Sequence, residues 1–119
     1  MNMSFSMTTD PFRRKIKTVT RRDGWDNIKL GEIHHGIEKG QGLKRGEHVV
    51  VIHDFIPTSS RWEPLQYLLD DPEYGKREVI LEGFPNLTPA QFVDMLCKKN
   101  KCTPDKLFNR IEFKYVEES

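Results

Sequence analysis

The chain has 119 residues and a mass of 14.0 kDa, and its formal net charge at pH 7 is +1. This length favours one domain with a modest core, and the balanced charge excludes a global positive field that would draw the whole protein onto nucleic acid. No apolar run approaches the ~20 residues of a membrane span, and two cysteines do not make a disulfide framework. We therefore expect a cytoplasmic protein with no membrane partner.

Residues 1–9 lack the charged start and apolar centre of a secretion signal. We predict that they form a flexible leader, followed by a single domain at residues 10–119. The leader is followed by Asp10-Pro11-Phe12, which predicts a short helical turn because Asp is a good cap and Pro suits the first helical position.

The segment 15–25 predicts a short strand that ends in a turn at Asp23-Gly24. Thr and Val favour strands because their branched β-carbons fit a pleated surface. Hydroxyls and cations are concentrated here and suit an anionic or hydrogen-bond-rich ligand; they are Lys17, Thr18, Thr20, Arg21 and Arg22. The alternative interpretation is an edge strand whose charges discourage pairing with another chain.

The middle of the chain predicts strands and one helix. Residues 26–46 are rich in glycine and predict loops with short strands, and residues 43–47 predict a tight turn. The apolar run 48–56 predicts a strand buried on both faces that ends at Pro57. A helix is expected over 63–69, with Ser59 or Ser60 as its N-cap.

The last part of the chain predicts two further helices and a closing strand. One short helix is expected over 73–81, and Thr88-Pro89-Ala90-Gln91 is a capping box that begins another, ending near Lys99-Asn100. Residues 110–115 alternate in polarity and predict a half-buried strand. The fold class is therefore α+β: a small, partly open barrel with helices inserted before the closing strand.

The segment 17–22 resembles the signature of ASCH domains, G-x-K-x-x-E/T-x-R. Lys17, Thr20 and Arg22 take the Lys, acid-or-Thr and Arg positions, and Lys15 stands where that family has Gly. From about 17 to 116 the chain is similar to short phage and prophage-type proteins with this pattern. The other shared phrases are Gly24-Trp25, Leu30-Gly31-Glu32, Glu38-Lys39-Gly40, residues 70–75, Glu82-Gly83-Phe84-Pro85 and residues 110–113. The resemblance implies a PUA-like (ASCH) β-barrel.

The resemblance also implies an enzymatic hypothesis. Small bacterial N4-acetylcytidine amidohydrolases of the ASCH group have a Lys and a Thr in a K-x-x-T strand and a Glu shortly before a helix that begins with Thr. Lys17, Thr20 and Glu82 match these catalytic positions, although the spacer before Thr88 is longer here. Deacylation needs a nucleophile or base, a proton donor and an oxyanion stabiliser. A partly desolvated lysine beside arginines has a lowered pKa, which suits it to that role.

The preferred hypothesis is recognition of a nucleobase, nucleotide or RNA segment. Arg21 and Arg22, with Lys17, offer phosphate contacts, while Trp25 and Phe84 offer stacking surfaces for an unpaired base. Core packing is the alternative role for each aromatic residue. Three other functions stay open: the amidohydrolase, RNA cleavage in which Lys17 and Arg22 stabilise the phosphorane, and a phage-encoded protein-interaction module. We expect a monomer or weak dimer.

We expect no cofactor and no metal site. The two cysteines have a C-x4-C spacing with no second ligand pair at a fixed offset. The adjacent His34 and His35 would point to opposite faces of a strand and could not easily chelate one ion.

Overall fold

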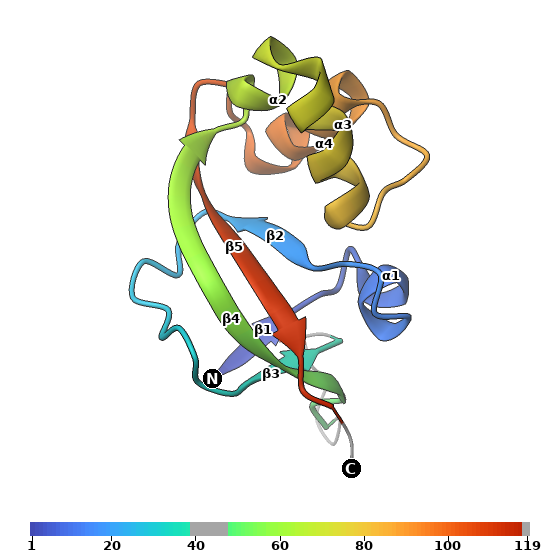
Figure 1. The fold of residues 1–119 in the computed structure, drawn as a ribbon, viewed down its shortest axis with the longest axis vertical. Helices are drawn as coiled ribbons and strands as arrows, with labels where there is room; N and C mark the ends of the chain where they lie inside the picture. The colour runs from blue at the N-terminus through green and yellow to red at the C-terminus, as the bar shows by residue number, and fades with distance from the viewer. Residues whose placement is uncertain (39–47, 118–119) are drawn as a thin grey trace.

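The computed structural model describes residues 1–38 and 48–117 (Figure 1). Within these residues the chain is α+β, with a five-stranded mixed sheet and four helices. In chain order the elements are β1 (Asn2–Ser4), α1 (Thr9–Arg13), β2 (Val19–Arg22), β3 (His34–Ile37), β4 (Val51–Pro64), α2 (Gln66–Asp70), α3 (Pro72–Leu81), α4 (Pro89–Asn100) and β5 (Leu107–Tyr115).

The sheet has the strand order β1-β3-β4-β5-β2. All neighbours are antiparallel except β1 and β3, which are parallel. β4 curves along its length, and α2, α3 and α4 gather at the end of the molecule where β4 finishes (Figure 1). Since β1 and β2 stand at the two ends of the order, the described strands do not form a closed ladder, and the barrel stays a prediction.

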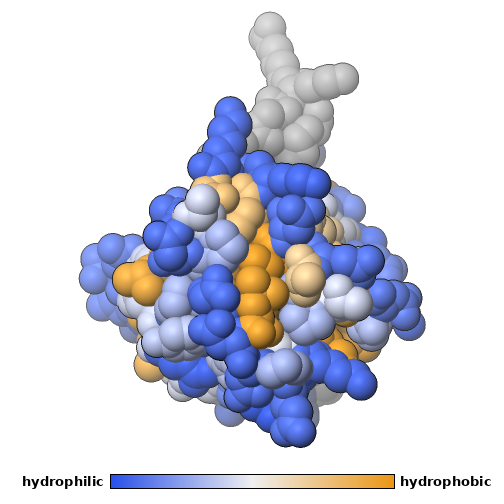
Figure 2. Space-filling model, turned by 90° about the horizontal axis from the view of Figure 1, so that it is seen from above, coloured by the Kyte–Doolittle hydropathy of each residue, from blue (hydrophilic) through white to orange (hydrophobic). Residues whose placement is uncertain are grey.

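Two hydrophobic clusters form the core. One lies on the sheet and consists of Met3, Phe5, Phe12, Phe55, Ile111 and Phe113. In it the rings of Phe5 and Phe12 stack with centroids 3.9 Å apart. The other lies among the helices and consists of Leu65, Leu68, Val79, Phe92, Val93 and Phe108. Viewed from the helical end, the surface is mostly hydrophilic, with a narrow hydrophobic strip near its centre and smaller patches toward its edges (Figure 2), as expected when α2, α3 and α4 turn most of their apolar side chains toward one another.

The N-terminal segment differs from the expected flexible leader. Asn2–Ser4 forms β1 against β3, and the backbone N–H of Phe5 donates to the Ile37 carbonyl at 2.8 Å. The side chains of Met3 and Phe5 are 0% and 1% exposed. The physical reason is that two apolar residues at period two are enough to anchor a short strand in a core, even where no targeting signal is present.

The predicted elements of the second half are largely confirmed. Helix α3 begins one residue before the expected range and ends at its expected end. In α4, Thr88 and Gln91 form the predicted capping box, and Pro89 is the first helical residue. Strand β5 contains the expected segment 110–115. In the first half of the chain, helix α1 covers the turn predicted at Asp10.

The prediction for residues 48–69 is wrong in two respects. The apolar run is not buried on both faces, since Val49, Val50 and Val51 are all exposed. β4 also continues past Pro57, because a register shift between Pro57 and Ser59 lets the ladder pass a residue without an N–H. Ser59 and Ser60 therefore pair with β5 and do not cap a helix, and α2 begins only at Gln66. The turn predicted at residues 43–47 lies outside the described residues.

Candidate functional site

One cleft of about 670 Å³ gathers most of the residues predicted for the site. It lies among β2, the N-terminal segment, the end of α3 and one side of α4. The predicted residues that line it are Lys17, Thr20, Arg21, Arg22, Trp25, Glu82 and Phe84. Thr18 does not line it; its backbone N–H donates to the Leu81 carbonyl and its carbonyl accepts from Phe113 N–H, so its role is to join β2 to its neighbours.

Lys17 and Glu82 are in direct contact although they lie 65 residues apart in the chain. The Lys17 Nζ donates to Glu82 Oε1 at 2.9 Å and to the Glu82 main-chain carbonyl at 2.8 Å. Gly83, which follows, has φ +100°, and a Cβ there would come within 2.7 Å of Pro11. Glycine therefore lets the chain leave α3 close to the segment that carries Lys17.

Burial lowers the pKa of Lys17, and the charge and hydrogen bond of Glu82 raise it in part. The positive charges of Arg22 and Arg21 lower it further, and the net pKa lies below the ordinary 10.5. The direction agrees with the expectation from the sequence. Desolvation and neighbouring cations both disfavour the protonated amine, which is how proteins prepare a lysine for acid–base work.

Three arginines lie in a row across the sheet, and they face carboxylates on one side of α3. Arg61, Arg110 and Arg21 are direct neighbours across β4, β5 and β2. Arg21 donates to Glu82 at 2.9 Å and to Glu78 at 2.6 Å, and Arg110 binds both oxygens of Glu78. Like charges side by side in a sheet repel, so the carboxylates of α3 are what make this row stable.

The buried part of this network is electrically balanced. Its cations are Lys17, Arg21 and Arg110, and its carboxylates are Glu63, Glu78 and Glu82. The hydroxyl of Tyr74 donates to Glu63 at 2.7 Å and completes the cluster. Because Glu82 already neutralises Lys17 and Arg21, these two residues are less available for phosphate than the sequence suggested.

Arg22 is the exception among the cations of β2. Its Nε donates to Thr20 Oγ1 at 3.0 Å, and its guanidinium carbon lies 4.9 Å from the centroid of the Phe5 ring. Within the described residues no carboxylate lies within ion-pair distance of it. Burial lowers the pKa of Arg22 to about 10, against a smaller opposing effect of Glu82. The site therefore holds one guanidinium whose charge the described residues do not neutralise by direct contact.

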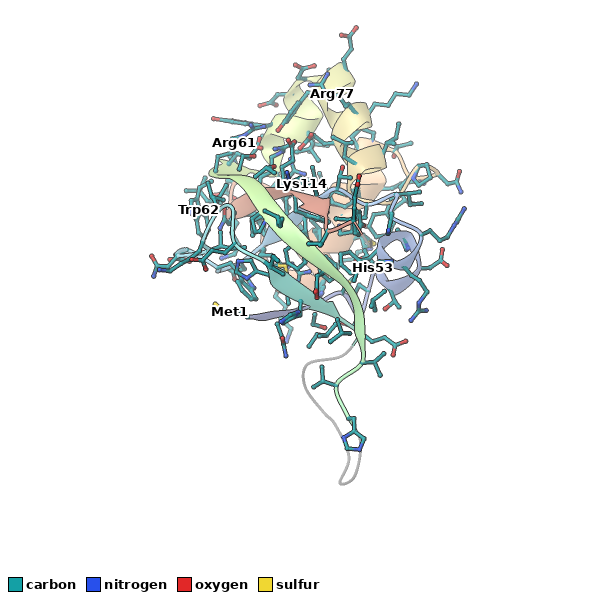
Figure 3. All side chains as sticks on the ribbon, turned by 60° about the horizontal axis from the view of Figure 1, so that its bottom comes forward. Met1, His53, Arg61, Trp62, Arg77 and Lys114 are labelled. Carbon is teal, nitrogen blue, oxygen red and sulfur yellow. The ribbon has the colours of Figure 1, made fainter. Side chains whose placement is uncertain are left out.

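The two aromatic residues predicted for the site also pack against the core. Trp25, with φ 59°, is half-buried and packs against the sheet cluster. The ring of Phe84 lies 5.7 Å from that of Phe92 and packs against the helical cluster. Both also line the cleft. Trp62 lies beside Arg61 where β4 approaches the helices (Figure 3), is 43% exposed and is not part of the cleft lining.

Several residues of the site were missed from the sequence. Tyr74 and Glu78 lie two turns and one turn before Glu82, so they share one side of α3, and this polar stripe at spacing four was a readable signal. Lys99 on α4 also lines the cleft, but nothing in its local sequence separates it from its lysine neighbours. The N-terminal segment contributes a wall that the leader interpretation had excluded.

No group of three or more His, Cys, Asp or Glu residues is placed to hold a metal ion in residues 1–38 and 48–117. His34 is buried and its ring stacks on Phe55, whereas His35 is exposed and contacts Asp54 at 2.6 Å. Cys97 and Cys102 are free thiols, and burial, followed by Cys102, raises the pKa of Cys97 to about 11. A raised pKa disfavours the thiolate that a nucleophile requires.

No family model, curated protein or solved structure matches this chain. Among the described residues, none of the helices is long and apolar enough to cross a membrane.

Proposed function

We propose that the cleft binds a nucleobase, as part of a nucleotide or of a single-stranded RNA segment. The observation that carries this proposal is the joint lining of one cleft by a polar pair and two aromatic side chains. Lys17 and Glu82 pair with each other in the buried wall of the cleft, where an entering base would have to share their hydrogen bonds, and Trp25 and Phe84 offer faces for stacking. An unpaired base needs both, since it has a flat π surface and an edge of donors and acceptors.

The proposal includes a PUA-like barrel of the ASCH type. Two features support it: the strong curvature of β4 (Figure 1) and the position of the K-x-x-T-x-R residues at the cleft. The missing glycine of the signature is relevant as well, because Lys15 takes a positive φ of 61°, a conformation that glycine adopts without strain.

Tryptophan fluorescence tests the binding proposal. Trp25 lines the cleft and Trp62 does not, so a Trp62→Phe protein reports on Trp25 alone. We expect one or more of the four common nucleosides, their 5′-monophosphates or a short single-stranded RNA to change this emission saturably. Trp25→Leu, measured by calorimetry because it lacks the reporter, should weaken binding by about fivefold or more, on the basis of ~1–3 kcal/mol per stacked base, whereas Trp62→Phe should not. Absence of any saturable response across the panel would contradict the proposal.

A second candidate is deacylation of an N4-acylated cytidine. It is favoured by the contact of Lys17, whose pKa is lowered, with Glu82 in a cleft that Thr20 also lines. Water adds to the acyl carbon, the C–N bond breaks, and the amine of cytidine leaves with a proton while the acyl group leaves as a carboxylate. Lys17 or Thr20 would activate the nucleophile and Glu82 would transfer the proton.

Incubation with N4-acetylcytidine, followed by chromatography, tests this candidate. We expect the wild-type protein to release cytidine and Lys17→Ala to release none. Thr20→Val, which keeps the side-chain shape, separates loss of chemistry from loss of folding. No release by the wild type would remove this substrate and leave the binding proposal intact.

A further inference from the structure

We propose that Arg22 and Lys99 form a phosphate subsite in this cleft, so that its ligand is a phosphorylated nucleotide or an RNA phosphate group and not a free nucleoside. This inference rests on the proposed function and assigns its ligand class. Arg22 comes from β2 and Lys99 from the last turn of α4, and both line the same cleft.

Arg22 is held in a way that leaves one edge of its guanidinium free. Nε donates to Thr20 Oγ1, and the guanidinium carbon lies over the Phe5 ring. Among the described residues the two Nη atoms have no hydrogen-bond partner, yet they are not among the fully buried unpaired atoms. They therefore keep some accessible surface, on a residue that lines the cleft. A guanidinium that is held at Nε and lies over an aromatic ring keeps its two Nη atoms as a two-pronged donor, which is the geometry that binds phosphate bidentately.

Lys99 supplies the second charge. Its neighbour Lys98 is engaged with Asp94 at 2.9 Å, while Lys99 has no carboxylate partner in the part of the chain that the structure describes. Burial and then the charge of Arg22 lower the pKa of Lys99, so the two cations act on each other. Two neighbouring cations are unfavourable unless an anion joins them.

The acids of the cleft do not supply that anion. Glu82 is bound to Lys17 and Arg21, and Asp23, the other acidic residue of the lining, lies 3.4 Å from Lys106. Ser4 and Ser6 also line the cleft and add two hydroxyl groups that can donate to an anion. A phosphate monoester carries about 1.5 to 2 negative charges at neutral pH. It therefore matches the charge of Arg22 and Lys99 better than a carboxylate does.

Calorimetric titration with matched ligands tests the subsite. The probes are the four common nucleosides, their 5′-monophosphates, ribose 5-phosphate, and a trinucleotide without terminal phosphates. The variants are Arg22→Gln and Lys99→Met, with Lys98→Met as the matched control on the same helix. Lys99 is exposed, so its replacement leaves folding intact, and thermal melting verifies this for each variant.

We expect a monophosphate to bind at least about tenfold more tightly than its nucleoside, as charge-assisted hydrogen bonds predict. Lys99→Met and Arg22→Gln should remove this advantage, and Lys98→Met should keep it. A trinucleotide that binds more tightly than the monophosphates, with the same sensitivity to both variants, would assign the subsite to an RNA phosphodiester.

The outcomes separate this inference from the proposed function. Equal affinity for nucleosides and monophosphates would overturn the phosphate subsite and leave base binding standing. Binding of ribose 5-phosphate and monophosphates with equal affinity, without nucleoside binding, would support the subsite and overturn base recognition. An advantage for monophosphates that survives both cleft variants would also overturn the subsite, and binding of none of the probes would overturn both proposals.

Discussion

Arg21 and Arg110 are direct cross-strand partners between β2 and β5, and both guanidinium groups bind the same carboxylate oxygen, Oε1 of Glu78. One acid on α3 thus joins two strands that would otherwise place like charges side by side. Glu82, one turn after Glu78 and at the C-cap of α3, binds Arg21 and Lys17. The network therefore ties α3 to the sheet and holds Lys17 at the floor of the cleft.

Glu78→Gln should lower the free energy of unfolding by about 3–5 kcal/mol, since it leaves Arg21 and Arg110 buried without their shared charge. Glu73→Gln, on an exposed position of the same helix, is the matched control and should change stability by less than about 0.5 kcal/mol. Urea denaturation measures both. Similar, small effects from the two variants would show that the network contributes little to stability.

The stability of the protein should fall as the pH drops below the ordinary Glu pKa of 4.5. Burial raises the pKa of Glu78, but the hydrogen bonds and charges of Arg110 and Arg21 outweigh it and hold the pKa below that value. The unfolded chain then binds the proton at a higher pH than the folded chain, so acid favours unfolding. Denaturation at pH 7 and pH 3 should show the difference between wild type and Glu78→Gln shrinking in acid. A constant difference would contradict this account.

Thr20→Val should weaken the binding of a 5′-monophosphate several-fold and leave nucleoside binding nearly unchanged. The reason is that Thr20 Oγ1 accepts from Arg22 Nε and thereby orients the guanidinium, and a neutral or charge-assisted hydrogen bond is worth about 1–3 kcal/mol. Comparison of the two affinities by calorimetry measures this. Equal losses for both ligands would instead indicate that Thr20 contacts the base.

Phe5→Ala should destabilise the protein by about 3–5 kcal/mol, which is typical of deleting a fully buried aromatic ring. Met7→Ala, at an exposed position two residues later, is the control and should cost less than about 0.5 kcal/mol. Thermal or urea melts distinguish the two. If both changes were neutral, the N-terminal segment would be dispensable, as the leader interpretation holds.

Gly75→Ala should destabilise the protein, although alanine is the better helix former by about 1 kcal/mol. An added Cβ would collide with the Leu68 carbonyl oxygen, which is backbone and cannot rotate away. Lys76→Ala, exposed on the same helix, should be nearly neutral. A stabilised Gly75→Ala protein would mean that α2 and α3 can separate without cost.

The sequence by itself determined the local elements. The capping box at Thr88 and Gln91 begins α4, and the alternation at residues 110–115 appears within β5. These features depend on residues within one or two turns of each other, so the sequence contains the whole interaction. The same local reasoning failed at Pro57, because only the register of β4 against β5 shows that the strand passes a proline.

The tertiary structure alone decided what each charged residue of the site can do. Lys17 and Glu82 meet across 65 residues, and the register of β2 against β5 places Arg21 next to Arg110. Arg21 and Arg22 are neighbours with equal formal charge, yet the alternation of a strand turns one to the acids of α3 and the other to the ring of Phe5. The composition gives the number of charged residues. Only the packing of α3 on the sheet decides which of these charges are neutralised and which remain open to a ligand.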